Sequence, residues 1–236
     1  MEAYDPTVEL REMVDAFDFR EVHPNLRIGT ASDRYGGWLD QIYPSERWAD
    51  EIKTRPKKIG GKTFEERVLP VESVQDYFGH FGVLELDFTY YRPLLEPSGE
   101  PSPNLRVLNE YARQAPPDAL FLLKAPQQFI TPTLRRSRGG DVSFEPNPTY
   151  LNAEAYDRDF QQPALELLQD RLIGVIFEQS YQRTQDSAEP DAQIEQLDAF
   201  FEAVPPVVQP HLEIRSPHLL TPAYFDWLAE RGLGHV

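Results

Sequence analysis

The chain has 236 residues, of which 40% are hydrophobic and 12% aromatic, so it can form a packed core in one large domain or two small ones, and global disorder is excluded. Its 39 acidic and 23 basic residues give a net charge of −16. Such a surface repels phosphate backbones, so nucleic-acid binding is not expected unless a local basic patch intervenes. The absence of cysteine excludes disulfides, thiolate metal sites and cysteine nucleophiles.

Residues 1–25 are expected to form an N-terminal extension with some helical character. This segment is acidic and interrupted by polar residues, which excludes a signal peptide. No apolar run in the chain approaches the ~20 residues that a membrane helix needs. We therefore expect a cytoplasmic protein without a membrane partner.

The first third of the chain predicts a strand, a loop and a helix. Residues 26–32 (LRIGTAS) are typical of a strand that ends in small polar residues. Residues 46–69 are charged and contain KIGGK, which indicates a loop insertion. The apolar spacing of residues 71–81 predicts a helix. A strand follows at once, at the start of VLELDFTYYRPL (residues 83–94).

Strands and helices then alternate, which predicts an α/β fold with a parallel sheet and crossover helices. Residues 126–152, rich in proline and containing RSRGGD, indicate a long loop. No GxGxxG follows the first strand and no P-loop motif occurs, which disfavours nucleotide-binding folds. The predicted helices are 102–116, 152–170, 192–204 and 221–232, and the predicted strands are 119–126, 172–179, 211–216 and a stub at 234–236.

The strand that begins at residue 83 carries unexpected carboxylates. Strict alternation places Glu85, Asp87 and Thr89 on one face. If helices cover both faces of the sheet, these carboxylates need cationic partners or they protonate, at a cost of several kcal/mol. Lys124 and Arg215 lie at matching depths near the ends of two other predicted strands.

Charged residues therefore gather at the carboxyl ends of the predicted strands, where active sites of parallel α/β proteins are built. One interpretation is a structural network of ion pairs. The other is a pocket in which Lys124 and Arg215 hold a phosphate or carboxylate group. The candidate catalytic residues are Glu85, Asp87, Lys124, Glu178 and Glu213, and the candidate substrate-binding residues are Tyr90, Tyr91, Arg92, Gln179, Arg215 and Trp38.

The carboxylates could act as general bases or as oxygen ligands of a divalent ion. The chain has only five histidines, too few and too scattered for a multi-zinc centre, so a hard ion with oxygen ligands is the expected choice if a metal binds. A Schiff base at Lys124 is chemically conceivable, but the acidic neighbours would raise its pKa.

Two basic clusters, at residues 55–58 (RPKK) and 134–138 (LRRSR), are expected to be solvated loop charges. The second cluster, which precedes a glycine pair, could alternatively close over a phosphate as a lid.

Several segments resemble motifs of one family. They are IGTASDRYGGWLDQIYP, YFGHFGVLELDFTYYRP, ALFLLKAPQQFITP, LIGVIFEQSYQ and HLEIRSPHL. Together, over residues 26–236, they are similar to the YecE-like family, domain of unknown function 72. The chain departs from the family pattern at Asp33, Pro132, Ser180 and Tyr181. The resemblance implies a TIM-type β/α barrel, related to xylose-isomerase and endonuclease-type barrels, and implies no particular reaction.

A (β/α)₈ barrel needs about 250 residues. We therefore expect residues 26–236 to form an incomplete barrel with about six of eight strands, either because the chain is a piece of a longer protein or because its open edge pairs with a partner. An open edge promotes oligomerisation. The expected function is that of a hydrolase or isomerase acting on a phosphorylated or sugar-containing substrate. The alternative is a non-catalytic binding or accessory scaffold.

Overall fold

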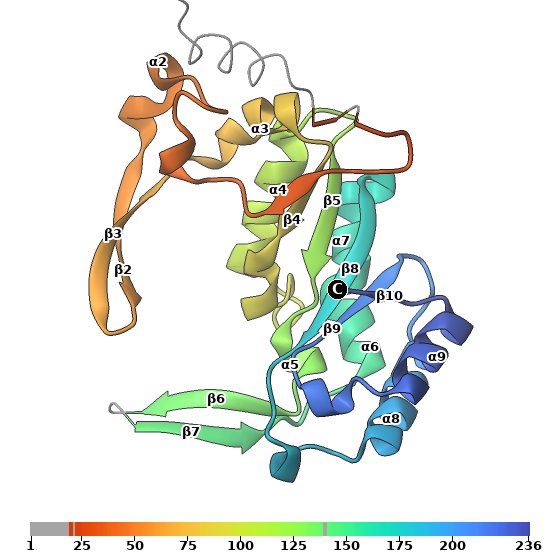
Figure 1. Cartoon of the computed structure of the whole chain (residues 1–236). Coiled ribbons are helices and arrows are strands. Elements are labelled where there is room, and N and C mark those ends of the chain that lie inside the picture. Colours follow the sequence, from red (N-terminus) through yellow and green to blue (C-terminus); the bar gives the residue numbers. More distant parts are fainter. Residues whose placement is uncertain (1–18, 21, 139–140) are drawn as a thin grey trace, which may run out of the picture. The chain divides into compact units, whose positions relative to one another are not determined.

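The computed structural model describes residues 19–20, 22–138 and 141–236, shown as a coloured ribbon in Figure 1. The chain divides into two compact units, Met1–Leu84 and Glu85–Val236, with the boundary inside strand β4 (Val83–Leu86). Most of the predicted N-terminal extension, namely residues 1–18 and 21, lies outside the described residues.

In the first unit, one tyrosine joins three segments. The Tyr77 hydroxyl, on α3 (Val74–His80), donates a hydrogen bond to the carbonyl of Val83 at 2.9 Å. The same hydroxyl accepts one from the Thr30 amide in β1 (Gly29–Ala31) at 2.8 Å. Burial raises the pKa of Tyr77 to about 12, so the hydroxyl keeps its proton and its donor role.

The predicted loop at residues 46–69 is wrong, because most of it forms an antiparallel hairpin of β2 (Lys53–Ile59) and β3 (Lys62–Val68). The two-residue turn has Gly60 at φ 56° and Gly61 at φ 79°, a left-handed conformation that glycine adopts without strain. The sequence concealed these strands because neither carries an apolar face. The unit also contains η1 (Gly36–Trp38), α2 (Ser45–Trp48), η2 (Ala49–Glu51) and η3 (Val71–Ser73).

The second unit is built on a largely parallel sheet in the order β4-β5-β8-β9-β10. Its further strands are β5 (Leu120–Lys124), β8 (Leu172–Gln179), β9 (Pro210–Ile214) and β10 (Gly234–His235). The pairs β5–β8, β8–β9 and β9–β10 are parallel, which confirms the predicted α/β class. Within the described part of the chain the sheet does not close, so a barrel is not established.

Helices connect successive strands, and two of them start on the residues that the sequence indicates. Ser102 accepts hydrogen bonds from the amides of Asn104 and Leu105, and Thr221 accepts one from Tyr224. Of the helices in the described residues, none is long and apolar enough to cross a membrane. The longer helices are α4 (Pro103–Gln114), α7 (Gln162–Leu168), α8 (Pro190–Ala203) and α9 (Pro222–Arg231); the shorter ones are α5 (Gln127–Ile130), α6 (Ala153–Tyr156), η6 (Gln169–Arg171), η7 (Thr184–Asp186) and η8 (Pro217–Leu219).

Three predicted segments differ in detail. The strand from residue 83 ends at Leu86, because the 3₁₀ helix η4 (Asp87–Tyr91) begins at the next residue. The predicted long loop contains a second antiparallel hairpin, β6 (Thr133–Arg138) with β7 (Asp141–Pro146), so the second basic cluster does not lie in a loop, while Gly139 and Gly140 lie outside the described residues. The predicted helix 152–170 contains the π-helical turn η5 (Asp157–Gln161).

An aromatic cluster forms much of the core between β8 and its covering helices. Tyr156 is fully buried and lies 5.3 Å from Phe177 and 5.7 Å from Phe200, measured between ring centroids. α7 packs against α4 and β8, and α8 packs against α6 and α9. This apolar layer fixes the position of β8, which carries Glu178 near its carboxyl end.

The His211 ring occupies space that two glycines leave open. A Cβ on Gly174 would lie 2.8 Å from His211 Nε2, and one on Gly234 would lie 2.0 Å from Nδ1. Both glycines belong to neighbouring strands, so the ring packs closely against them. Burial lowers the pKa of His211, since it penalises the charged imidazolium.

We predict that His211 makes stability depend on pH. In the unfolded chain a histidine has a pKa of about 6.5, and the native state prefers the neutral ring. The stabilising contribution is therefore complete above about pH 6.5 and declines as the pH falls through the lower folded-state pKa. Thermal unfolding at pH 7.5 and 5.5 should show a larger loss for the wild type than for His211→Gln. Equal losses in the two proteins would contradict this assignment.

Candidate functional site

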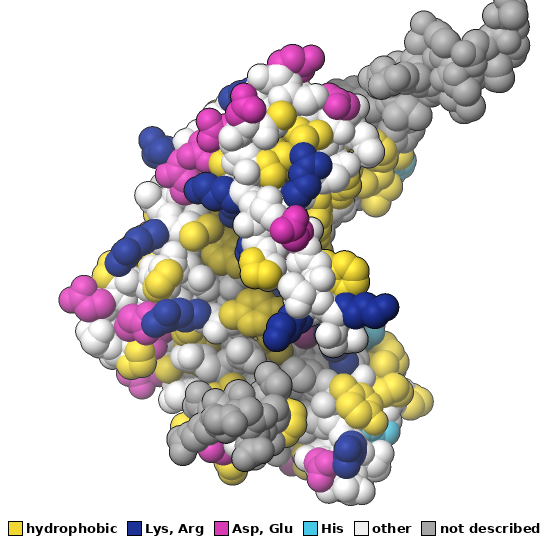
Figure 2. All heavy atoms as spheres, turned by 90° about the vertical axis from the view of Figure 1, so that its left-hand side faces the viewer, with side chains coloured by type: hydrophobic (Ala, Val, Ile, Leu, Met, Phe, Trp, Pro, Cys, Tyr) yellow, Lys and Arg dark blue, Asp and Glu magenta, His cyan; other side chains and the backbone are white. Residues whose placement is uncertain are grey.

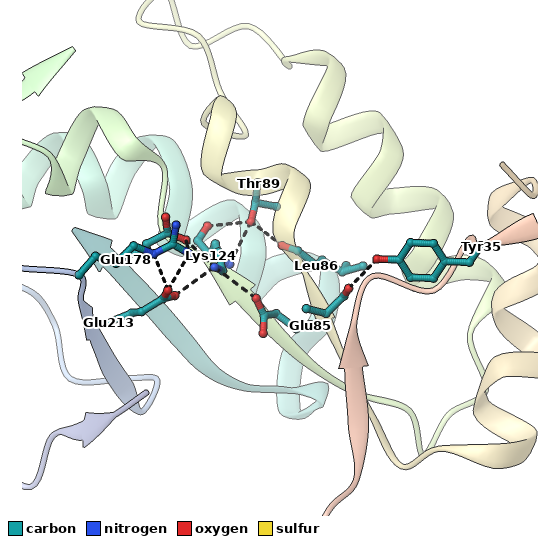
Figure 3. A network of polar contacts seen from close by, with 9 residues as sticks. Tyr35, Glu85, Leu86, Thr89, Lys124, Glu178 and Glu213 are labelled. Carbon is teal, nitrogen blue, oxygen red and sulfur yellow. Dashed lines mark hydrogen bonds and ion pairs between the residues drawn. The ribbon is translucent and has the colours of Figure 1, made fainter. Parts of the chain in front are cut away.

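Lys124, the last residue of β5, lies at the centre of a group of carboxylates from three other strands (Figure 3). Its ammonium nitrogen is 2.5 Å from Glu178 Oε2, 3.1 Å from Glu213 Oε2 and 3.6 Å from Glu85 Oε1. Only 12% of the Lys124 side chain is exposed. Four of the five predicted catalytic residues, Glu85, Lys124, Glu178 and Glu213, therefore meet at one cation, and together with Arg215 we call them the Lys124 cluster.

Glu178 and Glu213 face each other because they are register partners on the parallel strands β8 and β9. Adjacent strands are about 4.8 Å apart, so two ionised carboxylates at this position repel each other. Arg215 relieves the repulsion together with Lys124, since its Nη2 lies 2.7 Å from Glu213 Oε1 and 3.1 Å from Glu178 Oε2. Half of the Arg215 side chain is exposed, which places it at the solvent side of the cluster.

Thr89 holds the Lys124 backbone in place. Its hydroxyl lies 2.7 Å from the Lys124 carbonyl and 3.0 Å from the Leu86 carbonyl, and it accepts a hydrogen bond from the Lys124 amide at 3.1 Å. Thr89 is fully buried in η4. The turn that ends β4 thus docks on the end of β5, which fixes the position from which the lysine side chain extends.

The surroundings of the carboxyl groups shift their pKa values in different directions. Burial raises the pKa of Glu85, and the more distant Lys124 only partly opposes this effect. Burial also acts on Glu213, but its hydrogen bonds with Arg215 and Lys124 outweigh that effect and lower the pKa. Burial alone would lower the pKa of Lys124, yet its bonds to Glu178 and Glu213 raise it. The lysine is therefore a fixed cation, which argues against Schiff-base chemistry.

Four of the remaining candidates lie at or beyond the end of β4. The Tyr90 hydroxyl is 2.8 Å from Ser180 Oγ, and burial raises the pKa of Tyr90. Tyr91 is 72% exposed and packs edge-on against Tyr90. Asp87 is exposed at the start of η4, so the expectation that it continues the strand face of Glu85 is wrong.

Arg92 makes an ion pair with Glu96 at 2.7 Å, with both side chains substantially exposed. The guanidinium group of Arg92 is therefore already paired with a residue four positions further along the chain. Trp38 belongs to the first unit, where it contacts Tyr35 edge-on and stacks with Tyr43.

Gln179 points away from the Lys124 cluster, because successive residues of a strand face opposite sides and Glu178 belongs to the cluster. It is 1% exposed and donates to the Tyr150 hydroxyl at 3.3 Å, which also accepts from Gln193 at 3.1 Å. This buried network was not predicted. The position of Gln193 in the sequence could have indicated that its side chain is buried, since it lies on the apolar face of α8 with Leu197 and Phe200.

In the Lys124 cluster the carboxylates are not grouped as the ligands of a metal ion are. Among the described residues, no group of three or more histidine, aspartate or glutamate side chains is arranged to hold a metal ion. The three glutamates surround an ammonium group instead. A hollow of about 480 Å³ in this unit is lined by other residues, including Phe177, Phe201 and Val207, near the opposite end of β9.

Fold and site together define an α/β protein with a charged cluster at the carboxyl ends of parallel strands. The family model described as "Protein of unknown function DUF72" matches residues 27–236, so the chain belongs to this family. The resemblance noted from the sequence motifs is thereby confirmed. A comparison with curated proteins found no match.

Two solved structures of DUF72 family proteins are similar to the chain. For the protein from Thermotoga maritima the identity is 18% and the TM-score 0.51, and the alignment covers 89% of this chain and 63% of the other. For the protein from Enterococcus faecalis the identity is 14% and the TM-score 0.43, with 69% and 57% covered. The chain thus spans less than two thirds of the length of either protein. The likeness to the Thermotoga protein shows a shared fold.

We predict that Lys124→Met destabilises the protein by roughly 3–5 kcal/mol at neutral pH, because it leaves buried carboxylates without their cation. The loss should shrink as the pH falls toward about 4.5, where glutamates protonate. Adding Glu178→Gln should recover part of it. Urea unfolding of the single and double variants measures these differences.

Arg113→Met is the matched control, since it removes a cation from an exposed ion pair with Glu110 on α4. It should change the free energy of unfolding by less than about 1 kcal/mol. A Lys124→Met protein as stable as this control would show that the cluster does not depend on the lysine.

Proposed function

We propose that the Lys124 cluster is the active site of a hydrolase or isomerase that acts on a phosphorylated or sugar-containing substrate. The observation that carries the proposal is that two carboxyl groups around one ammonium group have pKa values shifted in opposite directions. The pKa of Glu85 is raised and the pKa of Glu213 is lowered. Titratable pairs whose environments push their pKa values apart are a common basis of acid–base catalysis. In this proposal Glu85 is the general acid and Glu213 the general base.

The geometry suits these roles. Glu85 is the carboxylate farthest from Lys124 Nζ, so it is the least restrained and can exchange a proton with a substrate. Glu213 is held by Lys124 on one side and Arg215 on the other, which keeps it ionised and oriented. Lys124 cannot act as a nucleophile, because its proton is held by two carboxylates. Its role is to position the glutamates.

The substrate class follows from the solvent side of the cluster. Arg215 is half exposed and can offer its guanidinium to a phosphate or carboxylate group. Tyr90 and Tyr91 follow Glu85 closely in the chain. They offer hydroxyl and ring surfaces of the kind that bind sugars. We further propose that the open sheet is part of a TIM-type barrel, which is supported by the sequential order of its strands and by a site at their carboxyl ends. A cytoplasmic location remains our proposal.

A second candidate is a non-catalytic binding or accessory scaffold. One observation favours it: the charges of the Lys124 cluster largely satisfy one another, since Lys124 and Arg215 both contact Glu178 and Glu213. A network of this kind can be purely structural. An enzyme converts the compound that it binds, whereas a scaffold binds it unchanged, so a measurement of turnover distinguishes the two functions.

We predict that Glu85→Gln lowers kcat/KM by about 10²–10⁴-fold, because it removes a general acid while preserving the shape of the side chain. The wild-type protein is incubated with a panel of sugar phosphates, p-nitrophenyl phosphate and p-nitrophenyl glycosides, and products are followed by NMR and absorbance. Binding of the active compound, measured by calorimetry, should persist in the variant.

Glu166→Gln, which changes an exposed carboxylate on α7, is the matched control and should keep full activity. If the wild type binds a member of the panel but converts none, the scaffold function replaces the enzymatic one. If Glu85→Gln retains full activity on a converted substrate, Glu85 is not the acid.

A further inference from the structure

The β2–β3 hairpin of the first unit differs in charge from the rest of the chain. Residues 53–68 contain six Lys or Arg residues and two Glu residues, whereas the whole protein carries a net charge of −16. Every described side chain from Lys53 to Glu65 is exposed, including Phe64 at 49%. Figure 2 looks onto this hairpin and shows basic side chains extending from the surface.

An exposed two-stranded ribbon needs an explanation, because such a hairpin gains little stability in water on its own. In the register of the pair, Lys53, Arg55 and Lys57 lie on the same face as their partners Val68, Glu66 and Phe64. Both ion pairs of the hairpin involve Glu66, which contacts Arg55 at 2.6 Å and also Lys57. These ion pairs within the hairpin thus involve one acidic residue, Glu66. With six Lys or Arg residues against two Glu residues, the hairpin keeps a net positive charge.

The base of the hairpin borders an aromatic hollow of about 710 Å³. Tyr35 and Trp38 form one wall, with ring centroids 4.9 Å apart, and Arg67 of β3 lines the hollow beside them. The remaining lining residues are Gly36, Gly37, Gln41 and Glu65.

This hollow has a defined shape because the backbone around it is fixed. A Cβ on Gly36 would lie 2.7 Å from Arg67 Cβ, so η1 packs directly against β3. Tyr35 forms an isolated bridge with Val68, and the Leu69 amide donates to the Arg34 carbonyl at 3.1 Å.

We propose that the β2–β3 hairpin and the adjoining hollow bind single-stranded nucleic acid. Cationic side chains along the hairpin contact the phosphates, and a base stacks on Trp38 with the Tyr35 ring, which stands edge-on to Trp38, beside it. Proteins that bind single strands without strict sequence preference combine these two elements, a basic track and aromatic platforms. Glu65 and Gln41 offer hydrogen-bonding groups to the edge of the stacked base.

The net charge of the chain does not prevent this binding. Each strand of the hairpin has seven residues, which corresponds to a length of about 23 Å at 3.3 Å per residue. At physiological ionic strength the Debye length is about 8 Å, shorter than the hairpin, so a phosphate on the hairpin responds mainly to the charges of residues 53–68 themselves. The local excess of lysine and arginine then determines the field that a phosphate meets.

An acidic protein surface is the competing occupant. It would satisfy the lysines but would leave the aromatic hollow without a role, because acidic side chains have no planar ring to stack on Trp38. A nucleic-acid base fills such a hollow, and stacking contributes about 1–3 kcal/mol per base. The combination of charge and aromatic surface therefore favours the single strand.

The test uses the full chain and a labelled single-stranded oligonucleotide of about 16 nucleotides, a length within the range of known single-strand sites. Fluorescence anisotropy gives the dissociation constant at several salt concentrations. For the double variant Lys58→Gln/Lys62→Gln, the slope of log K against log salt should become shallower by about 1.4, since each lost phosphate contact contributes about 0.7. Trp38→Ala should weaken binding about tenfold or more while leaving the slope unchanged.

Tyr35→Ala is a second probe of the hollow and guards against misfolding of the Trp38 variant. The matched control is Arg106→Gln/Arg183→Gln, which removes two exposed cations from the second unit and should leave the slope unchanged. The proposal is overturned if the wild type does not bind at low salt, or if the control reduces the slope equally. It is also overturned if polyglutamate of matched charge binds as tightly, or if the hairpin instead holds a second copy of the chain in sedimentation experiments.

Discussion

The arrangement of the second unit depends on one ion, the ammonium group of Lys124. Three glutamates from three strands converge on it, and only 12% of its side chain is exposed. Without this cation, Glu178 and Glu213 would face each other as adjacent like charges in a poorly solvated position. Thr89 fixes the Lys124 backbone through the turn that follows β4, so the end of one strand determines how the next one presents its cation.

The same ion creates a chemical difference between otherwise similar carboxyl groups. Glu213 receives hydrogen bonds from both Lys124 and Arg215, whereas Glu85 lies 3.6 Å from the ammonium and is governed mainly by burial. An uneven distribution of one cation among three acids thus shifts the pKa values of two carboxyl groups of one cluster in opposite directions. The proposed nucleic-acid surface of the first unit relies on different physics, namely an excess of cations on an exposed ribbon beside two aromatic rings.

The sequence was informative where burial shapes the pattern of residues. The apolar run of β8 and the capped helices α4 and α9 were predicted closely, and Glu85, Lys124, Glu178, Glu213 and Arg215 were correctly expected to meet. Asp87 was misplaced because alternation assumes that a strand continues, while η4 begins at that residue. Gln179 was assigned to the cluster by its position at a strand end, although neighbouring residues face opposite sides. Both hairpins were read as loops, because exposed strands lack the apolar alternation that reveals a strand.

We conclude that one shared ammonium group, that of Lys124, separates the protonation behaviour of Glu85 and Glu213. NMR titration of ¹³C-labelled glutamate side chains tests it most directly, with the ordinary glutamate pKa of about 4.3 as the reference. We expect the Glu85 carboxyl to titrate above this reference and the Glu213 carboxyl to titrate below it. Coincident titration of both groups, or the reverse order, would contradict it.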